Sequence, residues 1–244
     1  GAKAEAAVAR TLSHIGKETL PFGIRLDSAI PQGKGMASSS ADIAAVSYAT
    51  ARALGRELTA QEIMDIAIAI EPSDGIAFAG LSHVSHTTGK LFGQYFNVPL
   101  LAVSIFDVGG TVDTIAYYRS KGNRGNHDEV YRQLLDTVDQ AFRTRDLQQE
   151  ALLGQAATAS ARLNQVHLEK PKLEEFITAA QRQGALGTLV AHSGTIVGVL
   201  WASDLSAVDM AQQTSELAAE FEATYHYMQT VRLISGGVVC EIRP

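Results

Sequence analysis

The spacing of the apolar residues changes repeatedly along the 244-residue chain, and the order of these changes restricts the fold more than any single motif does. The spacing is helical over 3–15 and over 38–54, whereas 22–30 alternates as a half-buried strand does. Gly16 and Gly55 directly follow the two helical stretches and are expected to end them. The front of the chain therefore predicts a helix, a strand and a second helix.

Further along, helices and strands follow one another in separate groups. Thr59 and Glu62 predict a capping box for a third helix that ends near Ile70. Strands are expected at 81–86, 90–96 and 99–106, with a hairpin turn at 87–90. The remaining expected elements are helices at about 127–144, 147–163, 172–183 and 203–222, and strands at 187–193, 195–201, 226–234 and 236–242. Such grouping favours an α+β fold over an alternating parallel sheet.

Charge and composition exclude several classes of protein. A formal net charge of −6 provides no basic face for a phosphate backbone, so we expect no nucleic-acid partner. No apolar run approaches the ~18 residues of a membrane span, and no signal-peptide pattern opens the chain. Cys240 is the one cysteine, which excludes an internal disulfide and fits a small core residue in a reducing compartment. The sequence therefore predicts a cytoplasmic protein without a membrane partner.

A stretch rich in glycine and serine, "IPQGKGMASSSADIAA" at 30–45, joins the predicted strand to the second helix. It does not match a P-loop, because Gly35 follows Gly33-Lys34 and Ser28 stands where the first glycine is required. It also meets only two of the three glycine positions of the dinucleotide fingerprint. Glycines and a helix N-terminus nevertheless suit a phosphate. From the residues alone, a phosphate-binding loop and a helix start capped by one serine are equally supported.

The same stretch resembles the second motif of the GHMP small-molecule kinases, whose pattern is P-x-x-x-G-L-G-S-S-A-A. Met36 replaces the leucine of that pattern, Ala37 replaces a glycine and Ser40 replaces an alanine. The longer string "GKGMASSSADIAA" is most similar to the bacterial L-threonine kinase branch, which is associated with cobalamin side-chain synthesis and propanediol utilisation. The positions that match the family pattern are Pro31, Gly35, Ser38, Ser39 and Ala41.

The resemblance implies a fold and an activity. The implied fold is α+β with two domains, a ribosomal S5-like ATP-binding domain at 1–120 that lacks its N-terminal strands and a ferredoxin-like domain at 121–244. The implied activity is transfer of the γ-phosphate of ATP to an alcohol hydroxyl with Mg²⁺, with L-threonine as substrate and O-phospho-L-threonine as product.

The resemblance also implies the roles of particular residues, because in the family this loop wraps the ATP phosphates and a serine helps to coordinate Mg²⁺. A second segment, "VAHSGTIVGVL" at 190–200, resembles the third family motif, although an ordinary hairpin turn would also explain it. Ser39 is the implied metal contact. The residues implied to bind ATP are Lys34, Gly35, Met36, Ala37, Ser38, Ser39, Ser40, Ser193 and Gly194.

Phosphoryl transfer to an alcohol often uses a carboxylate that accepts the hydroxyl proton. In many family members an aspartate after the next helix has this role, and "IEPSDGIAF" at 70–78 stands at that place. Asp74 is therefore the candidate base and Glu71 a candidate metal ligand, although P-S-D-G is also a strong turn signal and Glu71 could equally be a solvated acid. The candidate substrate contacts are Thr111, Asp113 and Thr114.

Three points stay open at this stage. Family members open with strands that carry a first motif, so we expect this chain to be a fragment of a complete kinase, poorly active or inactive by itself. A homoserine or isoprenoid-pathway kinase is an alternative of the same class, and a nucleotide-binding module without catalysis is an alternative of another class. The oligomeric state cannot be read from the sequence, and a homodimer is one option.

Overall fold

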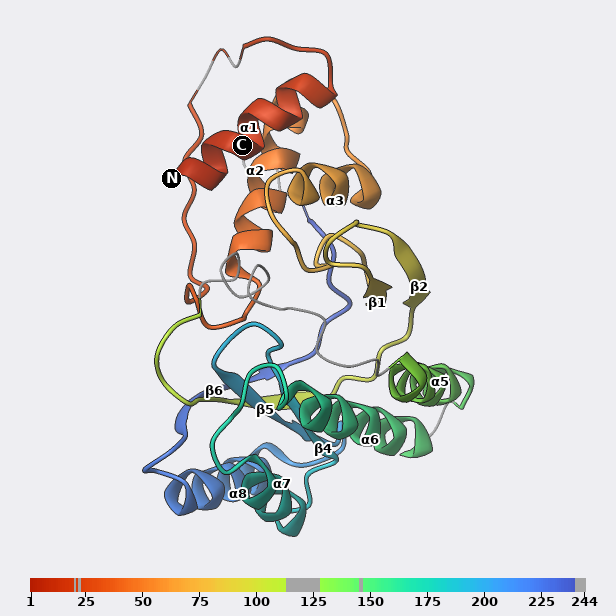
Figure 1. Ribbon diagram of the computed structural model, residues 1–244, viewed down its shortest axis with the longest axis vertical. Helices are drawn as coiled ribbons and strands as arrows, with labels where there is room; N and C mark the ends of the chain where they lie inside the picture. Colours follow the sequence, from red (N-terminus) through yellow and green to blue (C-terminus); the bar gives the residue numbers. More distant parts are fainter. Residues whose placement is uncertain (20, 22, 113–127, 145–146, 240–244) are drawn as a thin grey trace. The chain divides into compact units, whose positions relative to one another are not determined.

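The computed structural model describes residues 1–19, 21, 23–112, 128–144 and 147–239 (Figure 1). The chain forms two units. The first contains Gly1–Gln32, Ala37–Val98 and Ile234–Pro244, and the second contains Gly33–Met36 and Pro99–Leu233. The expected domain boundary at 120/121 lies outside the described residues. The chain enters the second unit earlier, at Pro99, because the strand that follows pairs with strands near the C-terminus.

The first unit consists of helices packed together and one hairpin, as Figure 1 shows in red to yellow. Apolar side chains of the helices form its core, in which Ile43, Val46 and Ile63 are almost fully buried. The hairpin is antiparallel and turns through 85–90, as predicted. The elements of this unit are α1 (Ala2–His14), α2 (Ser38–Ala53), α3 (Ala60–Ile68), β1 (Leu81–Val84) and β2 (Leu91–Tyr95).

Local signals in the sequence set the ends of these helices. Gly16 and Gly55 follow α1 and α2 with φ angles of 68° and 76°, values that favour glycine. The backbone N–H of Lys17 donates to the carbonyl of Leu12, which closes a Schellman motif. Thr59 and Glu62 form the predicted capping box at the start of α3.

The predicted strand at 22–30 is wrong for residues 23–29, and Phe22 lies outside the described residues. A strand needs a neighbour that completes its backbone hydrogen bonds, and within the part of the chain that the structure describes no strand pairs with this segment. Ile24 packs against α1 and α2, whereas Arg25 and Asp27 form an exposed ion pair. The alternating pattern over this segment therefore reflects one half-buried side chain, Ile24, between exposed neighbours.

The second unit is built around a four-stranded antiparallel sheet with the order β4-β5-β3-β6. Alternate residues of β3 face opposite sides of this sheet. Phe106 packs with α7 and α8, whereas Val103 and Ile105 pack with α5 and α6. The elements are β3 (Ala102–Asp107), α5 (Asp128–Arg143), α6 (Leu147–Asn164), α7 (Leu173–Arg182), β4 (Gly187–Val190), β5 (Ile196–Trp201), α8 (Ala207–Glu220) and β6 (His226–Arg232).

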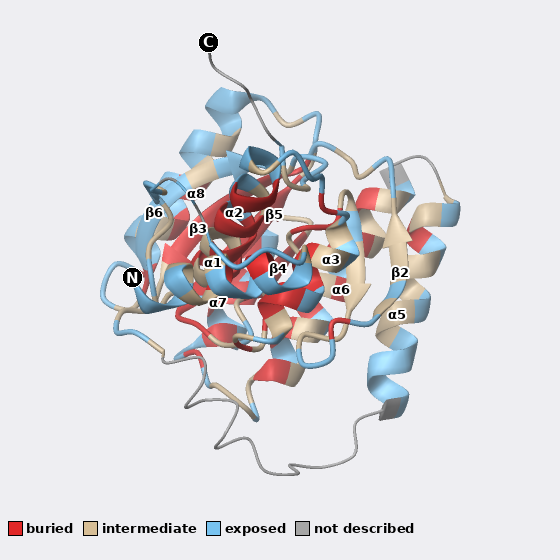
Figure 2. Cartoon of the chain, turned by 90° about the horizontal axis from the view of Figure 1, so that it is seen from above, coloured by how far each residue is buried: buried red, intermediate tan, exposed pale blue. Residues whose placement is uncertain are grey.

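Helices on both faces make β5 the buried centre of this unit, and all of its residues are buried (Figure 2). Trp201 at its end donates its indole N–H to the hydroxyl of Ser104 at 2.8 Å. Of the predicted strand at 236–242, the described residues 236–239 form one bridge, between Gly236 and Ala79, and Cys240 lies outside the described residues. Over the described ranges, no helix is long and apolar enough to cross a membrane.

The capping box yields a prediction about pH. Hydrogen bonds, above all from the backbone N–H of Thr59 and then from His14, lower the pKa of Glu62 from 4.5 to about 2. Because the pKa is lower in the folded state, the carboxylate stabilises the fold above its unfolded value of 4.5, and this contribution is lost as the pH falls towards 2.

We therefore expect Glu62→Gln to lower the free energy of unfolding at neutral pH, with a difference from wild type that shrinks as the pH falls from 4.5 towards about 2. Urea titrations across this range measure the effect. Glu57→Gln is the control, because its ion pair with Arg52 is more exposed and such pairs contribute little. A difference for Glu62→Gln that did not change with pH would contradict the assignment.

Candidate active site

The start of α2, in the first unit, has an unusual cap. Ala37 occupies the N-cap position with φ 56° and ψ 24°, and no side chain caps the helix among the described residues. The alternative in which one of the serines is the N-cap is therefore wrong, because Ser38, Ser39 and Ser40 are the first three residues of the helix itself. The N–H groups of the first turn and the positive end of the helix dipole are left available to an anion.

The serine hydroxyls instead bind the turn that follows α3. Ser39 Oγ donates a short hydrogen bond to Glu71 Oε1. Ser40 Oγ accepts a hydrogen bond of 3.0 Å from the backbone N–H of Asp74. Ser38 and Ser40 are buried, so little water reaches their hydroxyl groups. Four sequence-predicted residues, Ser39, Ser40, Glu71 and Asp74, are thus brought together within the first unit.

The turn at 71–75 is held from several sides. The N–H of Ser73 donates to the carbonyl of His86, and its hydroxyl donates to the carbonyl of Glu71. A Cβ on Gly75 would lie 2.6 Å from Val84 Cγ1, so the turn packs tightly on the hairpin. Asp74 itself is exposed. Its backbone N–H is bound to Ser40, and an exposed acid in such a turn can serve as a proton acceptor.

Lys3 is a member of this cluster that the sequence analysis did not identify. Its ammonium lies 2.8 Å from Glu71 Oε2 and donates to Ser39 Oγ at 3.0 Å. The Glu71 side chain is only 3% exposed, so its charge is compensated by this lysine rather than by water. A lysine in the first turn of a helix carries no local sign of such a contact.

The residues predicted on the second unit form a separate group. Gly35 has φ 81°, and a Cβ there would lie 2.5 Å from Ala191 Cβ and 2.8 Å from Gly194 Cα. Gly194 in turn is packed against the backbone of Lys34 and Gly35. The N–H of Thr195 donates to the carbonyl of Lys34 at 2.9 Å. The two predicted motif glycines therefore meet backbone to backbone, where any side chain would separate them.

The Lys34 side chain is held by an acid that the sequence analysis missed. Its Nζ lies 2.5 Å from Asp107 Oδ2 and 2.7 Å from the carbonyl oxygen of Gly110. Burial raises the pKa of Asp107, but hydrogen bonds from Lys34, from the Thr195 side chain and from the N–H of Gly109, together with the charge of Lys34, outweigh this and lower it overall. An acid at the end of an apolar strand, two positions before a Gly-Gly pair, was the available signal for this contact.

The remaining predicted site residues lie in the core, beside the loop or in a turn, or are outside the described residues. Met36 packs against the core between the sheet and α5 and α6. Thr111 lies beside Gly33, and the next residue donates its N–H to the carbonyl of Gly33. Ser193 lies in the turn between β4 and β5. Asp113 and Thr114 lie outside the described residues.

Ser39 and Glu71 suit Mg²⁺ better than a metal that needs a complete protein shell. Among the described residues, no group of three or more His, Cys, Asp or Glu could hold a metal ion. Mg²⁺ commonly binds through one or two carboxylates and substrate phosphates and keeps several waters. A hydroxyl and a buried carboxylate beside an uncapped helix start therefore fit such an ion.

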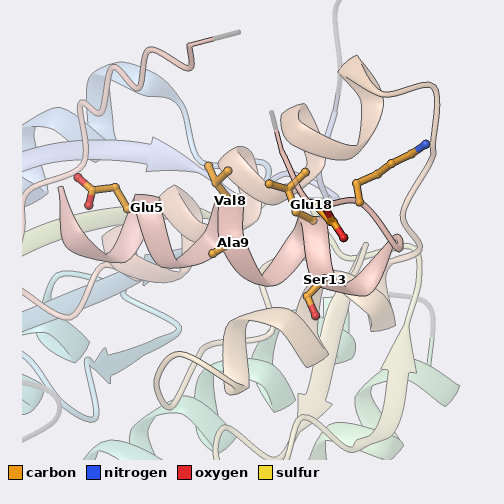
Figure 3. Close-up of a pocket in the computed structure, with 7 residues that line it drawn as sticks. Glu5, Val8, Ala9, Ser13 and Glu18 are labelled. Carbon is orange, nitrogen blue, oxygen red and sulfur yellow. The ribbon is translucent and has the colours of Figure 1, made fainter. Parts of the chain in front are cut away.

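An open groove also runs along α1, and none of the serines of α2 lines it (Figure 3). Glu5 and Glu18 bring negative charge to it, and the middle is formed by small and aliphatic side chains. These carboxylates make it a poor site for phosphate. The groove is lined by Glu5, Val8, Ala9, Leu12, Ser13, Lys17 and Glu18.

Comparisons with known proteins agree with the geometry at α2. The family model of the GHMP kinases N terminal domain matches residues 2–81. L-threonine kinase of Salmonella typhimurium is 32% identical over 221 residues, which is 88% of this chain and 72% of that protein. L-threonine kinase of Citrobacter freundii is 29% identical over 88% of this chain and 75% of that protein. The structure of homoserine kinase from Cytophaga hutchinsonii has a similar fold, with a TM-score of 0.66 at 16% identity over 96% of this chain and 76% of that one.

The contact between the motif glycines yields a prediction about stability. We expect Gly194→Ala to lower the free energy of unfolding by about 1–3 kcal/mol, because the new Cβ would overlap the backbone of Lys34 and Gly35, which cannot move aside as a side chain can. Urea denaturation measures the change.

Gly23→Ala is the matched control, because a Cβ at Gly23 has no atom within 4 Å and the backbone there is not left-handed. We expect its effect to stay within about 0.5 kcal/mol. Equal effects of the two substitutions would show that the close approach of Gly194 to the loop is not a feature of the folded protein.

Proposed function

This chain belongs to the GHMP kinase family of phosphotransferases, and on that premise we propose that it transfers the γ-phosphate of ATP to the hydroxyl of L-threonine. The family gives the small-molecule kinase chemistry and the use of ATP. The choice of threonine is supported by the two L-threonine kinases that align with most of this chain. A role of the product, O-phospho-L-threonine, in cobalamin side-chain synthesis is part of this proposal.

The observation that carries the proposal is the cluster at the start of α2. An uncapped helix start offers N–H groups to phosphate oxygens, and a buried carboxylate and a hydroxyl lie beside it at Glu71 and Ser39. The backbone of Asp74 is bound to Ser40 in the same turn of helix. An anion site, a cation site and an exposed base are thus assembled from one short segment and the turn that it binds.

In the proposed mechanism Asp74 accepts the proton of the threonine hydroxyl as that oxygen bonds to the γ-phosphorus, while the bond from the γ-phosphorus to the bridging oxygen breaks and ADP leaves. Ser40 keeps the Asp74 backbone in place, which limits the positions that the carboxylate can take. Ser39 and Glu71 would hold Mg²⁺, which when bound neutralises charge on the phosphate oxygens. The N–H groups of the first turn of α2 would bind phosphate oxygens directly.

The proposal extends to the predicted residues of the second unit. Backbone groups of 34–36 and 193–194 are proposed to bind ATP, and the Lys34 side chain would do so by exchanging Asp107 for phosphate. Thr111, Asp113 and Thr114 remain proposed substrate contacts. The strand order β4-β5-β3-β6, with helices between β3 and β4 and between β5 and β6, supports the proposed ferredoxin-like class for this unit.

A kinase assay on an Asp74→Asn variant tests the central role. We expect kcat with L-threonine to fall by about 10²–10⁴-fold, because the amide cannot accept the hydroxyl proton. The affinity for ATP, measured by equilibrium binding, should stay close to that of the wild type, since the Asp74 backbone N–H that binds Ser40 is retained.

Asp204→Asn is the matched control, because Asp204 is an exposed acid before α8 in the second unit. We expect its kcat to be unchanged. An Asp74→Asn variant with wild-type kcat would remove Asp74 from the mechanism. If the wild type phosphorylates homoserine or an isoprenoid alcohol but not threonine, the proposed substrate is wrong and the proposed kinase class is kept. If it binds ATP but phosphorylates no alcohol, the result favours a nucleotide-binding module without catalysis.

A further inference from the structure

Glu71 is a buried acid of the first unit, and its carboxylate needs a positive charge nearby. Its side chain is 3% exposed, and the ion pair that the structure gives it is with Lys3. Oε1 accepts the hydroxyl of Ser39. Oε2 is close to the Lys3 ammonium but accepts no hydrogen bond of good geometry among the described residues. Burying a charged carboxylate lowers the stability of the fold unless a cation lies beside it.

Lys3 supplies this positive charge, and its side chain can move away from Glu71 easily. Its side chain is 49% exposed, so water can solvate the ammonium once it moves away from Glu71. The ammonium lies 2.8 Å from Glu71 Oε2 and 3.0 Å from Ser39 Oγ. It therefore contacts the same two side chains that were proposed above to hold Mg²⁺.

We propose that Lys3 is a positioning residue that occupies the cation position at Glu71 and Ser39 until a divalent ion displaces it. This inference rests on the proposed metal role of those two side chains. The lysine and the ion exclude each other, because both need the same oxygens and two cations at such a separation repel strongly in a buried site. Between turnovers Lys3 keeps the carboxylate compensated and the Ser39 hydroxyl in place.

Two consequences follow from this competition. Removal of the ammonium should strengthen divalent-ion binding, because the ion no longer has to displace a tethered rival. It should also destabilise the metal-free protein, because the Glu71 carboxylate loses its counter-charge, and a saturating ion should reverse that loss. A lysine that merely contributed to stability would produce the second effect without the first.

The experiment measures Mn²⁺ binding to the purified protein without nucleotide, by electron paramagnetic resonance of the free ion, together with the Tm. For Lys3→Met we expect the Kd for Mn²⁺ to fall by at least about fivefold, the lower end of typical coupling between sites. We expect its Tm to lie below that of the wild type without metal and to return to it at saturating Mn²⁺. Lys3→Arg, which keeps the charge, should resemble the wild type in both measurements.

Lys17→Met is the matched control, because Lys17 is an exposed lysine just after α1 and should change neither quantity. If Lys3→Met does not fold, Lys3→Gln with Glu71→Gln removes both charges and should fold while losing the Mn²⁺ site. An unchanged or weaker Mn²⁺ affinity in Lys3→Met would overturn the inference.

Failure of the inference and failure of the proposed function give different results. If threonine is phosphorylated and Glu71→Gln weakens Mn²⁺ binding while Lys3→Met leaves it unchanged, only the competition is wrong. If Glu71→Gln leaves Mn²⁺ binding unchanged, the metal role of Glu71 is wrong and the inference fails with it. If the wild type phosphorylates no alcohol, the proposed function fails, whatever the Mn²⁺ data show.

Discussion

The hydroxyl groups of Ser39 and Ser40 join the first turn of α2 to the turn at 71–74, and the candidate site depends on this connection. Ser39 and Ser40 lie inside the helix and bind Glu71 and the Asp74 backbone, and the N-cap residue is Ala37, whose side chain cannot cap the helix. The positive end of the helix dipole and its N–H groups are then available to a ligand. The same contacts bring the acidic residues to that helix end, where a phosphate and its counter-ion would need them.

In the second unit the glycine-rich loop is held by a contact between two backbone segments and not by a contact between side chains. Gly35 and Gly194 approach so closely that neither position accepts a Cβ without displacement of the other. The carbonyl of Lys34 is bound by Thr195, and its ammonium by Asp107. The glycines let the two backbone segments approach each other closely, and the ion pair with Asp107 holds the Lys34 side chain in this structure.

Helices and their ends could be predicted from the sequence because their signals are local. The capping box of Thr59 and Glu62 and the glycines after α1 and α2 lie within a few residues of the structure that they specify. The strand at 22–30 failed because a strand depends on a distant partner that its own pattern does not reveal. Lys3 and Asp107 were missed for the same reason, since Lys34 and Asp107 are 73 positions apart. The role of Asp74 stays a prediction, and only the resemblance to a family motif led to it.

The most direct measurement is amide hydrogen exchange of the protein with and without a non-hydrolysable ATP analogue and Mg²⁺. If the start of α2 binds the phosphates, the N–H groups of 38–40 should gain protection, since no side chain caps them in the free protein and the first backbone bond of the helix is the one from Ala41 to Ala37. The turn at 71–75 should become protected with them, because Ser39 and Ser40 connect the two segments. Protection confined to the groove along α1, with 38–40 unchanged, would contradict the account.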